Sequence, residues 1–292
     1  MNCPRCQAGL APGDRFCADC GARVAAPDPP AAGRLAETVG PGLAALTDPG
    51  LVRRTNQDAF AISGAANGDD DAILVVCDGV SNSQSPELAA ATAARIAHAA
   101  LAEAQAAGAA RGPAMRAAIR QAHEAVCALP FDRQAELDPP ATTIAAAWRH
   151  PAGATLGWLG DSRAYILAAS GGSLLTRDHS WLAMTLDRHE MSEASARRDP
   201  RAHALLHCLG TTDFSGASPC PEPGIVEIVA ADGWLLLCTD GLWNYAETAA
   251  AIIRAVGEEL HGEAAGICAR LVEFARSSGG HDNVTVAAVR WR

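Results

Sequence analysis

Five aspartates stand at the ends of short apolar, strand-like runs, where a side chain could do chemistry. They are Asp78 in "LVVCDG", Asp161 in "LGWLGDSR", Asp240 in "LLLCTDGL", Asp282 in "GGHDNVTV" and Asp58 in "RRTNQDAF". Taken singly, an Asp-Gly pair is an ordinary turn. Converging carboxylates repel one another unless cations lie between them, and all-oxygen ligands favour Mg²⁺ or Mn²⁺. The repeated setting therefore favours a divalent metal centre over a set of unrelated turns.

A second set of metal-ligand residues lies in "CPRCQAGLAPGDRFCADCGA". Cys3, Cys6, Cys17 and Cys20 form two Cys-x2-Cys pairs, which together can complete a tetrahedral zinc site. A redox pair or a chance spacing is the alternative. Four thiolate ligands leave no open position, so this zinc would be structural. We expect a zinc ribbon over residues 1–24 whose folding depends on the metal.

The rest of the chain divides into a linker and one large domain. Residues 25–34 are rich in Pro and Ala and lack an apolar period, which is typical of a linker. Residues 35–292 are enough for a single domain with a large core. They contain neither a Walker A sequence nor a Rossmann glycine pattern.

The elements that must position the aspartates fall into groups. Helices are expected over 86–107, 113–129, 246–260 and 263–277, with Ser85 as the N-cap of the first and Pro86 at its first position. Strands are expected at 43–47, 58–63, 72–79, 142–150, 154–161, 163–170, 173–179, 224–230, 234–240 and 283–291. Strands grouped with strands, and helices in pairs, predict an α+β fold with a layered sheet core covered by helices.

Charge and hydropathy exclude several classes of function. The formal charge is −10 and all 23 basic residues are arginine, so nucleic acid is disfavoured as the main partner. The most apolar runs, "AILVVC" and "WLLLC", are far shorter than the ~20 residues that a membrane-spanning helix needs. Cysteines occupy the place where a signal peptide would carry its apolar region. We expect a cytoplasmic protein without a membrane segment.

Six segments together carry a family resemblance. In order along the chain they are "VRRTNQD", "VVCDGV", "GDSRAYIL", "RDHS", "LLCTDGLW" and "GGHDNVTV". This ordered set resembles the metal-dependent serine/threonine protein phosphatases of type 2C over about residues 36–292. The resemblance implies a four-layer α-β-β-α sandwich of two antiparallel sheets flanked by helix pairs. It also implies a binuclear Mn²⁺ or Mg²⁺ centre at one edge of the sandwich.

The resemblance also implies which residues bind the metals. Asp78 matches the carboxylate that bridges two cations, and Gly79 matches the ligand that binds through its backbone carbonyl. Asp240 and Asp282 match the other direct ligands. Asp161 matches a position that, in bacterial members, holds a third, weaker metal together with the equivalent of Asp240.

Two more residues acquire roles in the reaction from the resemblance. Arg53 matches the arginine that binds the substrate phosphate, and Asp58 matches a residue that orients metal-bound water. A hydroxide bridging the two cations would attack phosphoserine or phosphothreonine in line with the leaving oxygen. The expected partners are phosphorylated proteins, including a serine/threonine kinase or its substrates.

Three departures from the family pattern leave an alternative open. Gln57 stands where a glutamate is common, Ser81 and Asn82 stand where two small residues are common, and Val80 stands where animal members carry a proton-donating histidine. Gln57, Ser81 and Asn82 support a catalytically weak or silent phosphatase-fold module that binds phosphorylated partners. Val80 leaves only the general acid unassigned, because bacterial members commonly lack that histidine. A nucleic-acid-binding ribbon is a third hypothesis, disfavoured because the ribbon has few basic residues.

Four residues within these six segments are expected to have structural roles. Arg163 of "GDSR" is expected to support its turn, and Trp243 after "DGL" to be a packed aromatic. His179 and His281 are expected to make hydrogen bonds at polar edges, with metal ligation as the less favoured alternative.

Overall fold

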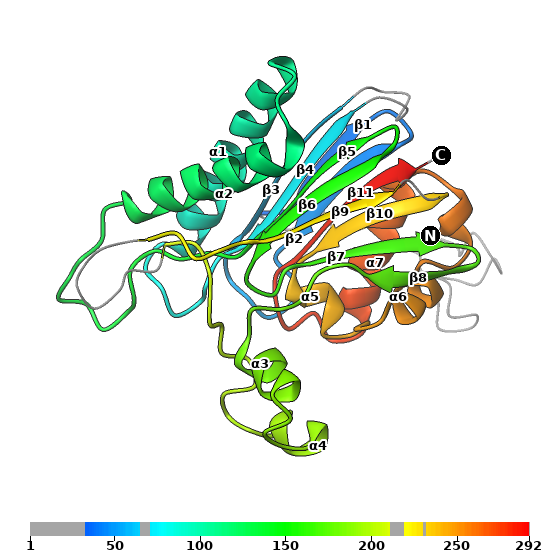
Figure 1. Cartoon of the computed structure of the whole chain (residues 1–292). Helices are drawn as coiled ribbons and strands as arrows, with labels where there is room; N and C mark the ends of the chain where they lie inside the picture. The colour runs from blue at the N-terminus through cyan, green and yellow to red at the C-terminus, as the bar shows by residue number, and fades with distance from the viewer. Residues whose placement is uncertain (1–32, 65–70, 211–218, 230–231, 292) are drawn as a thin grey trace, which may run out of the picture. The chain divides into compact units, whose positions relative to one another are not determined.

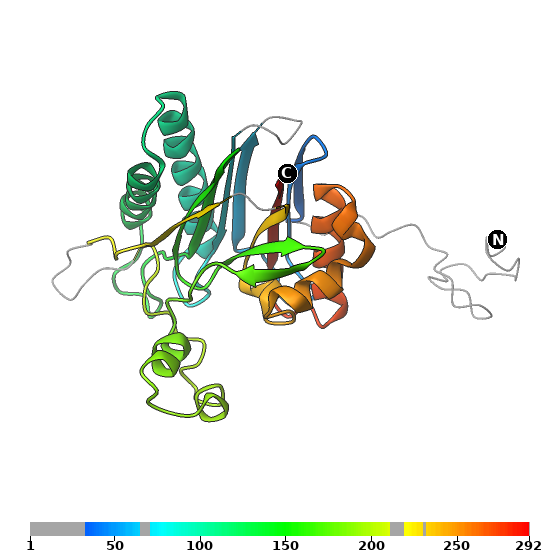
Figure 2. The same cartoon turned by 45° about the vertical axis from the view of Figure 1, so that its right-hand side comes forward.

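The computed structural model describes residues 33–64, 71–210, 219–229 and 232–291. Within these ranges two antiparallel sheets lie face to face, and a helix pair covers each outer surface (Figures 1 and 2). The predicted α-β-β-α layering is therefore confirmed for the described residues. The zinc ribbon expected over 1–24, and all of the linker before Gly33, lie outside them.

One sheet has six strands in the order β1-β2-β11-β10-β7-β8. They are β1 (Leu35–Val39), β2 (Leu43–Asp48), β7 (Arg163–Ala168), β8 (Gly171–Leu174), β10 (Gly233–Cys238) and β11 (Val284–Trp291). Strand β11 lies between β2 and β10, so it joins two parts of the sheet that come earlier in the sequence. Strand β1 has no counterpart among the expected strands because its residues are mostly exposed and lack an apolar run. The strand expected at 173–179 ends already at Leu174.

The other sheet has five strands in the order β3-β4-β5-β6-β9. They are β3 (Asp58–Gly64), β4 (Ala72–Asp78), β5 (Ile144–His150), β6 (Gly153–Leu159) and β9 (Gly224–Val229). All of its neighbouring strands are antiparallel.

Helices cover the outer faces of both sheets, and a further segment with short helices extends beyond one edge of the sandwich (Figure 2). The five-stranded sheet carries α1 (Pro86–Ala106) and α2 (Arg111–Cys127), and the six-stranded sheet carries α6 (Ala249–Val256) and α7 (Ala264–Ser277), with a 3₁₀ turn at Gly257–His261. Three short helices remain: α3 (Trp181–Asp187), α4 (Glu193–Ala196) and α5 (Asp240–Trp243). None of the helices in the described ranges has the length and apolarity that a bilayer crossing requires.

The central strands are buried on both faces, which explains their continuous apolar runs. In β4, Ile73, Val75 and Cys77 pack beneath α1 and α2, whereas Leu74 and Val76 pack against the other sheet. Burying each large aliphatic side chain contributes about 1.5–3 kcal/mol relative to leaving it exposed. Strand β4, which ends at Asp78, is therefore held rigidly from both sides.

The start of α1 corrects one prediction. Ser85 is not a side-chain N-cap: it has a left-handed backbone, with φ 48° and ψ 51°, and its hydroxyl caps no amide. Its carbonyl oxygen instead accepts hydrogen bonds from the amides of Leu88 and Ala89. Pro86 does occupy the first helical turn and Glu87 follows it, as predicted. The chain thus turns sharply into α1, which brings the start of the helix back against the end of β4.

Candidate active site

The strand ends that carry the aspartates meet at one edge of the sandwich. Asp78 ends β4, Asp240 follows β10, Asp161 follows β6 and Asp282 precedes β11. All four residues line one cleft of about 800 Å³. The structure therefore brings together four acids that lie up to about two hundred residues apart in the sequence.

Gly79 lies at the same cleft, where the backbone passes close to two other segments. A Cβ atom at this position would lie 2.4 Å from the carbonyl oxygen of Pro86 and 2.7 Å from that of Gln57. Thr143 fixes the preceding residue, because its hydroxyl accepts from the amide of Asp78 at 3.0 Å and its amide donates to the carbonyl of Asp78 at 2.8 Å. The backbone at Gly79 is therefore fixed in close contact with neighbouring segments, and only glycine fits there because it has no Cβ atom.

Asp58 lies behind the cleft and is buried. It pairs directly with Asp78 across β3 and β4. Its Oδ2 atom accepts hydrogen bonds from the hydroxyls of Thr239 and Thr285, both at 2.8 Å. The two threonines fix the orientation of this carboxylate, and nothing in the local sequence around them signals that role.

Arg53 faces the acids from the loop before β3. Its Nη2 atom lies 2.7 Å from Oδ2 of Asp282. The neighbouring Asn283 accepts from the amide of Gln57 at 2.8 Å and donates to the carbonyl of Thr55 at 2.9 Å. Asn283 thus ties the loop that carries Arg53 to the start of β11.

Desolvation is the largest cause of the raised pKa values of the acids. It raises the pKa of Asp58 to about 7, that of Asp240 to about 6 and that of Asp161 to about 8. The pKa of Asp78 is raised well above its ordinary value, again chiefly by desolvation. Repulsion from Asp240 adds to the pKa of each of the other three. The cluster carries more negative charge than its surroundings stabilise, and bound cations would relieve this excess.

In the described part of the chain, no three carboxylate, imidazole or thiol side chains enclose a cation position as they stand. Asp282 is paired with Arg53, and Asp240 accepts from Nδ2 of Asn244 at 3.2 Å. The guanidinium thus provides part of the charge compensation that a cation would give. The donor set itself fits Mn²⁺ or Mg²⁺, since the carboxylates and the carbonyl of Gly79 supply only oxygen ligands.

Comparison with known proteins decides the family. The family model of protein phosphatase 2C matches residues 53–265, which include Arg53 and the cleft aspartates Asp78, Asp161 and Asp240. The chain belongs to the protein phosphatase 2C family. It is a metal-dependent serine/threonine protein phosphatase, as the names of its relatives also indicate.

Relatives and solved structures agree with this assignment. The serine/threonine phosphatase stp of Listeria welshimeri is 30% identical over 83% of this chain and 93% of its own length. The PPM Ser-Thr phosphatase MsPP of Mycobacterium smegmatis, solved in complex with cacodylate, is 28% identical with a TM-score of 0.68, covering 87% of this chain and 99% of that one. The catalytic domain of the phosphatase PstP, solved with two manganese ions, is 26% identical with a TM-score of 0.64, covering 85% and 97%.

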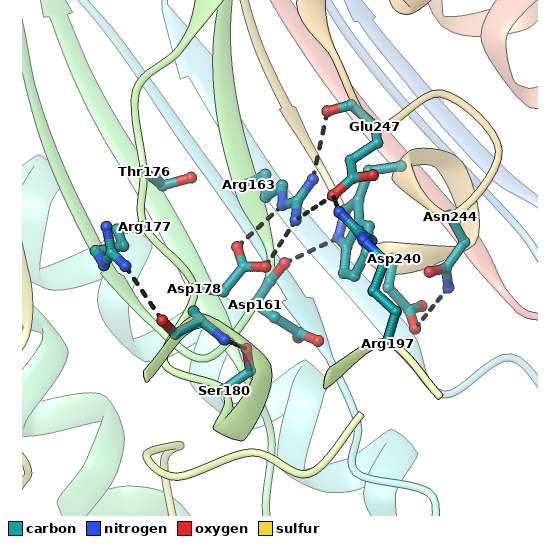
Figure 3. Close-up of polar contacts among 12 residues, drawn as sticks. Asp161, Arg163, Thr176, Arg177, Asp178, Ser180, Arg197, Asp240, Asn244 and Glu247 are labelled. Atoms are coloured by element: carbon teal, nitrogen blue, oxygen red, sulfur yellow. Dashed lines mark hydrogen bonds and ion pairs between the residues drawn. The ribbon is translucent and has the colours of Figure 1, made fainter. Parts of the chain in front are cut away.

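Arg163 organises the side of the phosphatase cleft next to Asp161 (Figure 3). Its guanidinium bonds both carboxylate oxygens of Asp178, at 2.9 and 2.7 Å, and lies 3.9 Å over the ring of Trp243. The indole of Trp243 donates to the carbonyl of Asp161 at 2.9 Å. The structural roles predicted for Arg163 and Trp243 are confirmed, and the indole belongs to α5, the helix that begins at Asp240.

A second arginine connects the segment that carries α3 and α4 to the sandwich. Arg197 donates to Glu193 at 2.8 Å and to Glu247 at 2.9 Å. Glu247 also lies 3.8 Å from Arg163 (Figure 3). The same segment contributes residues 200, 203–205 and 208 to the wall of the cleft. We define the contact between Arg197 and Glu247 as the clasp.

Breaking the clasp should weaken substrate binding and leave the chemistry intact. We expect Arg197→Ala to raise the KM for a phosphothreonine peptide about threefold with kcat unchanged, because an exposed ion pair contributes about 0.2–1 kcal/mol. Steady-state kinetics on Arg197→Ala, Glu247→Ala and the double variant would measure the coupling.

Arg188→Ala is the matched control for the clasp. Arg188 pairs at 3.6 Å with Glu190 of its own segment, so its loss should leave KM unchanged. If Arg197→Ala raised KM equally in the Glu247→Ala background, the two side chains would act independently and the clasp would have no role.

The remaining polar residues near the cleft have hydrogen-bonding duties. Nδ1 of His179 accepts from the amide of Gly160 at 3.3 Å, which agrees with the predicted structural role. At the cleft rim, the hydroxyl of Ser81 donates to Oε1 of Gln57 at 3.0 Å. The side chains of Gln57 and Ser81 therefore bond each other at the rim of the cleft.

Proposed function

We propose that this phosphatase hydrolyses phosphoserine and phosphothreonine in proteins with two Mn²⁺ or Mg²⁺ ions held by Asp78, Gly79, Asp240 and Asp282. The observation that carries the proposal is the convergence of the three aspartates with Arg53 on one cleft. Asp161 with Asp240 would hold a third, weaker ion. Divalent cations bound there would make hydroxide available near neutral pH and offset the charge of the phosphate.

The residues of the chain supply binding and orientation. Arg53 would exchange Asp282 for the substrate phosphate, to which a guanidinium can donate two parallel hydrogen bonds. Asp58, fixed by two threonine hydroxyls, would accept a hydrogen bond from the attacking water and so aim it at phosphorus. The buried strands behind these side chains prevent the cleft from collapsing.

Metal dependence tests this function directly. We expect wild-type protein treated with a chelator to release phosphate from a phosphothreonine peptide only at the background rate, and Mn²⁺ or Mg²⁺ to restore turnover. Phosphate release is measured alongside peptide binding. Binding without release at any Mn²⁺ concentration would overturn hydrolysis and support the silent phosphopeptide-binding module instead.

The remaining proposals concern the N-terminal zinc ribbon, the substrates and the location of the protein in the cell. The zinc ribbon over 1–24, with Cys3, Cys6, Cys17 and Cys20 holding one structural Zn²⁺, would serve as a docking module attached to the phosphatase domain over 35–292. The substrates would include a serine/threonine kinase or the proteins that it phosphorylates. A cytoplasmic location is supported by the six described cysteines, none of which forms a disulfide with another described residue.

A further inference from the structure

The proposed hydrolysis leaves one proton unassigned. When the bond from phosphorus to a serine or threonine oxygen breaks, that oxygen becomes an alkoxide, a poor leaving group unless a proton reaches it. Val80, which lines the same cleft, has no proton to give. The donor must therefore be another group that lines the cleft.

Most side chains of the cleft wall cannot donate this proton. The guanidinium of Arg53 keeps its protons throughout the accessible pH range. Aspartates that hold cations are ionised and carry no proton. Burial raises the pKa of the Cys208 thiol to about 12, so that it holds its proton too tightly. Among the described residues that line the cleft, His203 is the one imidazole, the group that exchanges protons near neutral pH.

The position of His203 suits a group that meets the substrate. It lines the catalytic cleft and also a smaller adjoining hollow of about 90 Å³ bounded by Asp161, Trp243 and Asn244. The pKa of Asp240 is raised mainly by desolvation, and the charge of His203 lowers it in part, so the two groups lie within electrostatic reach. The imidazole side chain is exposed and can therefore contact a bound phosphopeptide.

The backbone on both sides of His203 is fixed. The amide of Ala202 donates to the carbonyl of Asp199 at 2.9 Å, and the carbonyl of Ala204 accepts from the amide of Trp181 at 2.8 Å. The guanidinium of Arg201 lies 4.3 Å over the ring of Trp181. An exposed imidazole on a fixed backbone can reach a substrate without a large loss of conformational entropy.

We propose that His203 is a catalytic residue that protonates the leaving oxygen. The oxygen of the attacking water forms the new bond to phosphorus, gives one proton to solvent and keeps the other in the phosphate product. The electron pair of the breaking bond passes to the serine or threonine oxygen, which takes the proton of the His203 imidazolium. The neutral imidazole then regains a proton from solvent, and the products are inorganic phosphate and the free hydroxyl side chain. This inference rests on the function proposed above.

Comparing two leaving groups tests the role of His203. A phosphothreonine peptide needs the proton, whereas p-nitrophenyl phosphate releases a stable phenolate without one. We expect His203→Ala and His203→Gln to lower kcat roughly 100-fold on the peptide and less than about threefold on p-nitrophenyl phosphate. Added imidazole should restore part of the peptide activity of His203→Ala.

His207→Ala is the control, because His207 is exposed on the same segment but is absent from the residues lining the cleft. It should match wild type on both substrates, and all variants should melt at the wild-type temperature. An unchanged peptide rate in His203→Ala, or equal losses on both substrates, would overturn the role of His203. Failure of the hydrolysis proposal is distinguishable, because wild-type protein with Mn²⁺ would then hydrolyse neither substrate.

Discussion

Asp240→Asn should lose Mn²⁺-dependent hydrolysis of a phosphothreonine peptide by roughly 10³-fold or more in kcat/KM, since metal-ion catalysis contributes several kcal/mol to the transition state. Asparagine keeps the size of the side chain and replaces one charged ligand oxygen with an amide. The charge of Asp240 acts on Asp58, Asp78 and Asp161 and helps to raise the pKa of each. Its loss should therefore affect every proposed cation position at once.

Two further measurements make the Asp240→Asn result specific. Without metal the variant should melt at or above the wild-type temperature, because one of several mutually repelling carboxylates is gone. Asp187→Asn removes a charge from an exposed pair with Arg177 and should leave activity unchanged. Equal turnover by wild type and Asp240→Asn would show that this carboxylate holds no catalytic cation.

Gly241→Ala should lower stability by about 3 kcal/mol, the upper range for forcing extra atoms into a packed site. A Cβ atom at Gly241 would lie 1.9 Å from the carbonyl oxygen of Asn283, a backbone atom that cannot rotate away. This corresponds to a fall of about 10 °C in melting temperature for a domain of this size, measured by calorimetry. Since α5 would have to move, Asp240 would move with it and activity should fall as well.

Gly112→Ala is the matched control for this substitution. Gly112 lies in α2, where an added Cβ would meet only Oε1 of Glu227 at 3.5 Å, and alanine is the better helix former. We expect the control to keep or slightly raise the melting temperature. A Gly241→Ala protein that melted like wild type would mean that α5 and the turn before β11 are not in fixed contact.

The aspartates could be predicted from the sequence because the signal is local. An aspartate that ends or follows a short apolar run lies at the end of a buried strand whenever that run forms one. The runs before Asp78 and Asp240 do form buried strands, β4 and β10. The helix pairs were predictable for the same reason, with ends that differ by a few residues. The Ser85 cap was wrong because the carbonyl of that residue, and not its hydroxyl, meets the first amides of α1.

The residues that support the aspartates could not be predicted in this way. Thr239 and Thr285 both bond Asp58, at sequence separations of 181 and 227 residues. Asn283 bonds the loop of Arg53 across a separation of more than two hundred residues, and the clasp spans 50. Each of these residues looks like an ordinary turn or surface residue until the fold brings its partner near. The sequence of a single chain carries no local signal for such long-range contacts.

The place of β11 in the six-stranded sheet has a consequence for synthesis on the ribosome. Strands β2 and β10 emerge long before β11, yet each pairs with it and not with the other. Until β11 is released, the sheet consists of two separate parts with unpaired edges, and pairing of such distant segments is intrinsically slow. Asp282, a proposed cation ligand, arrives immediately ahead of that strand, so we expect a nascent chain to lack phosphatase activity until β11 has docked.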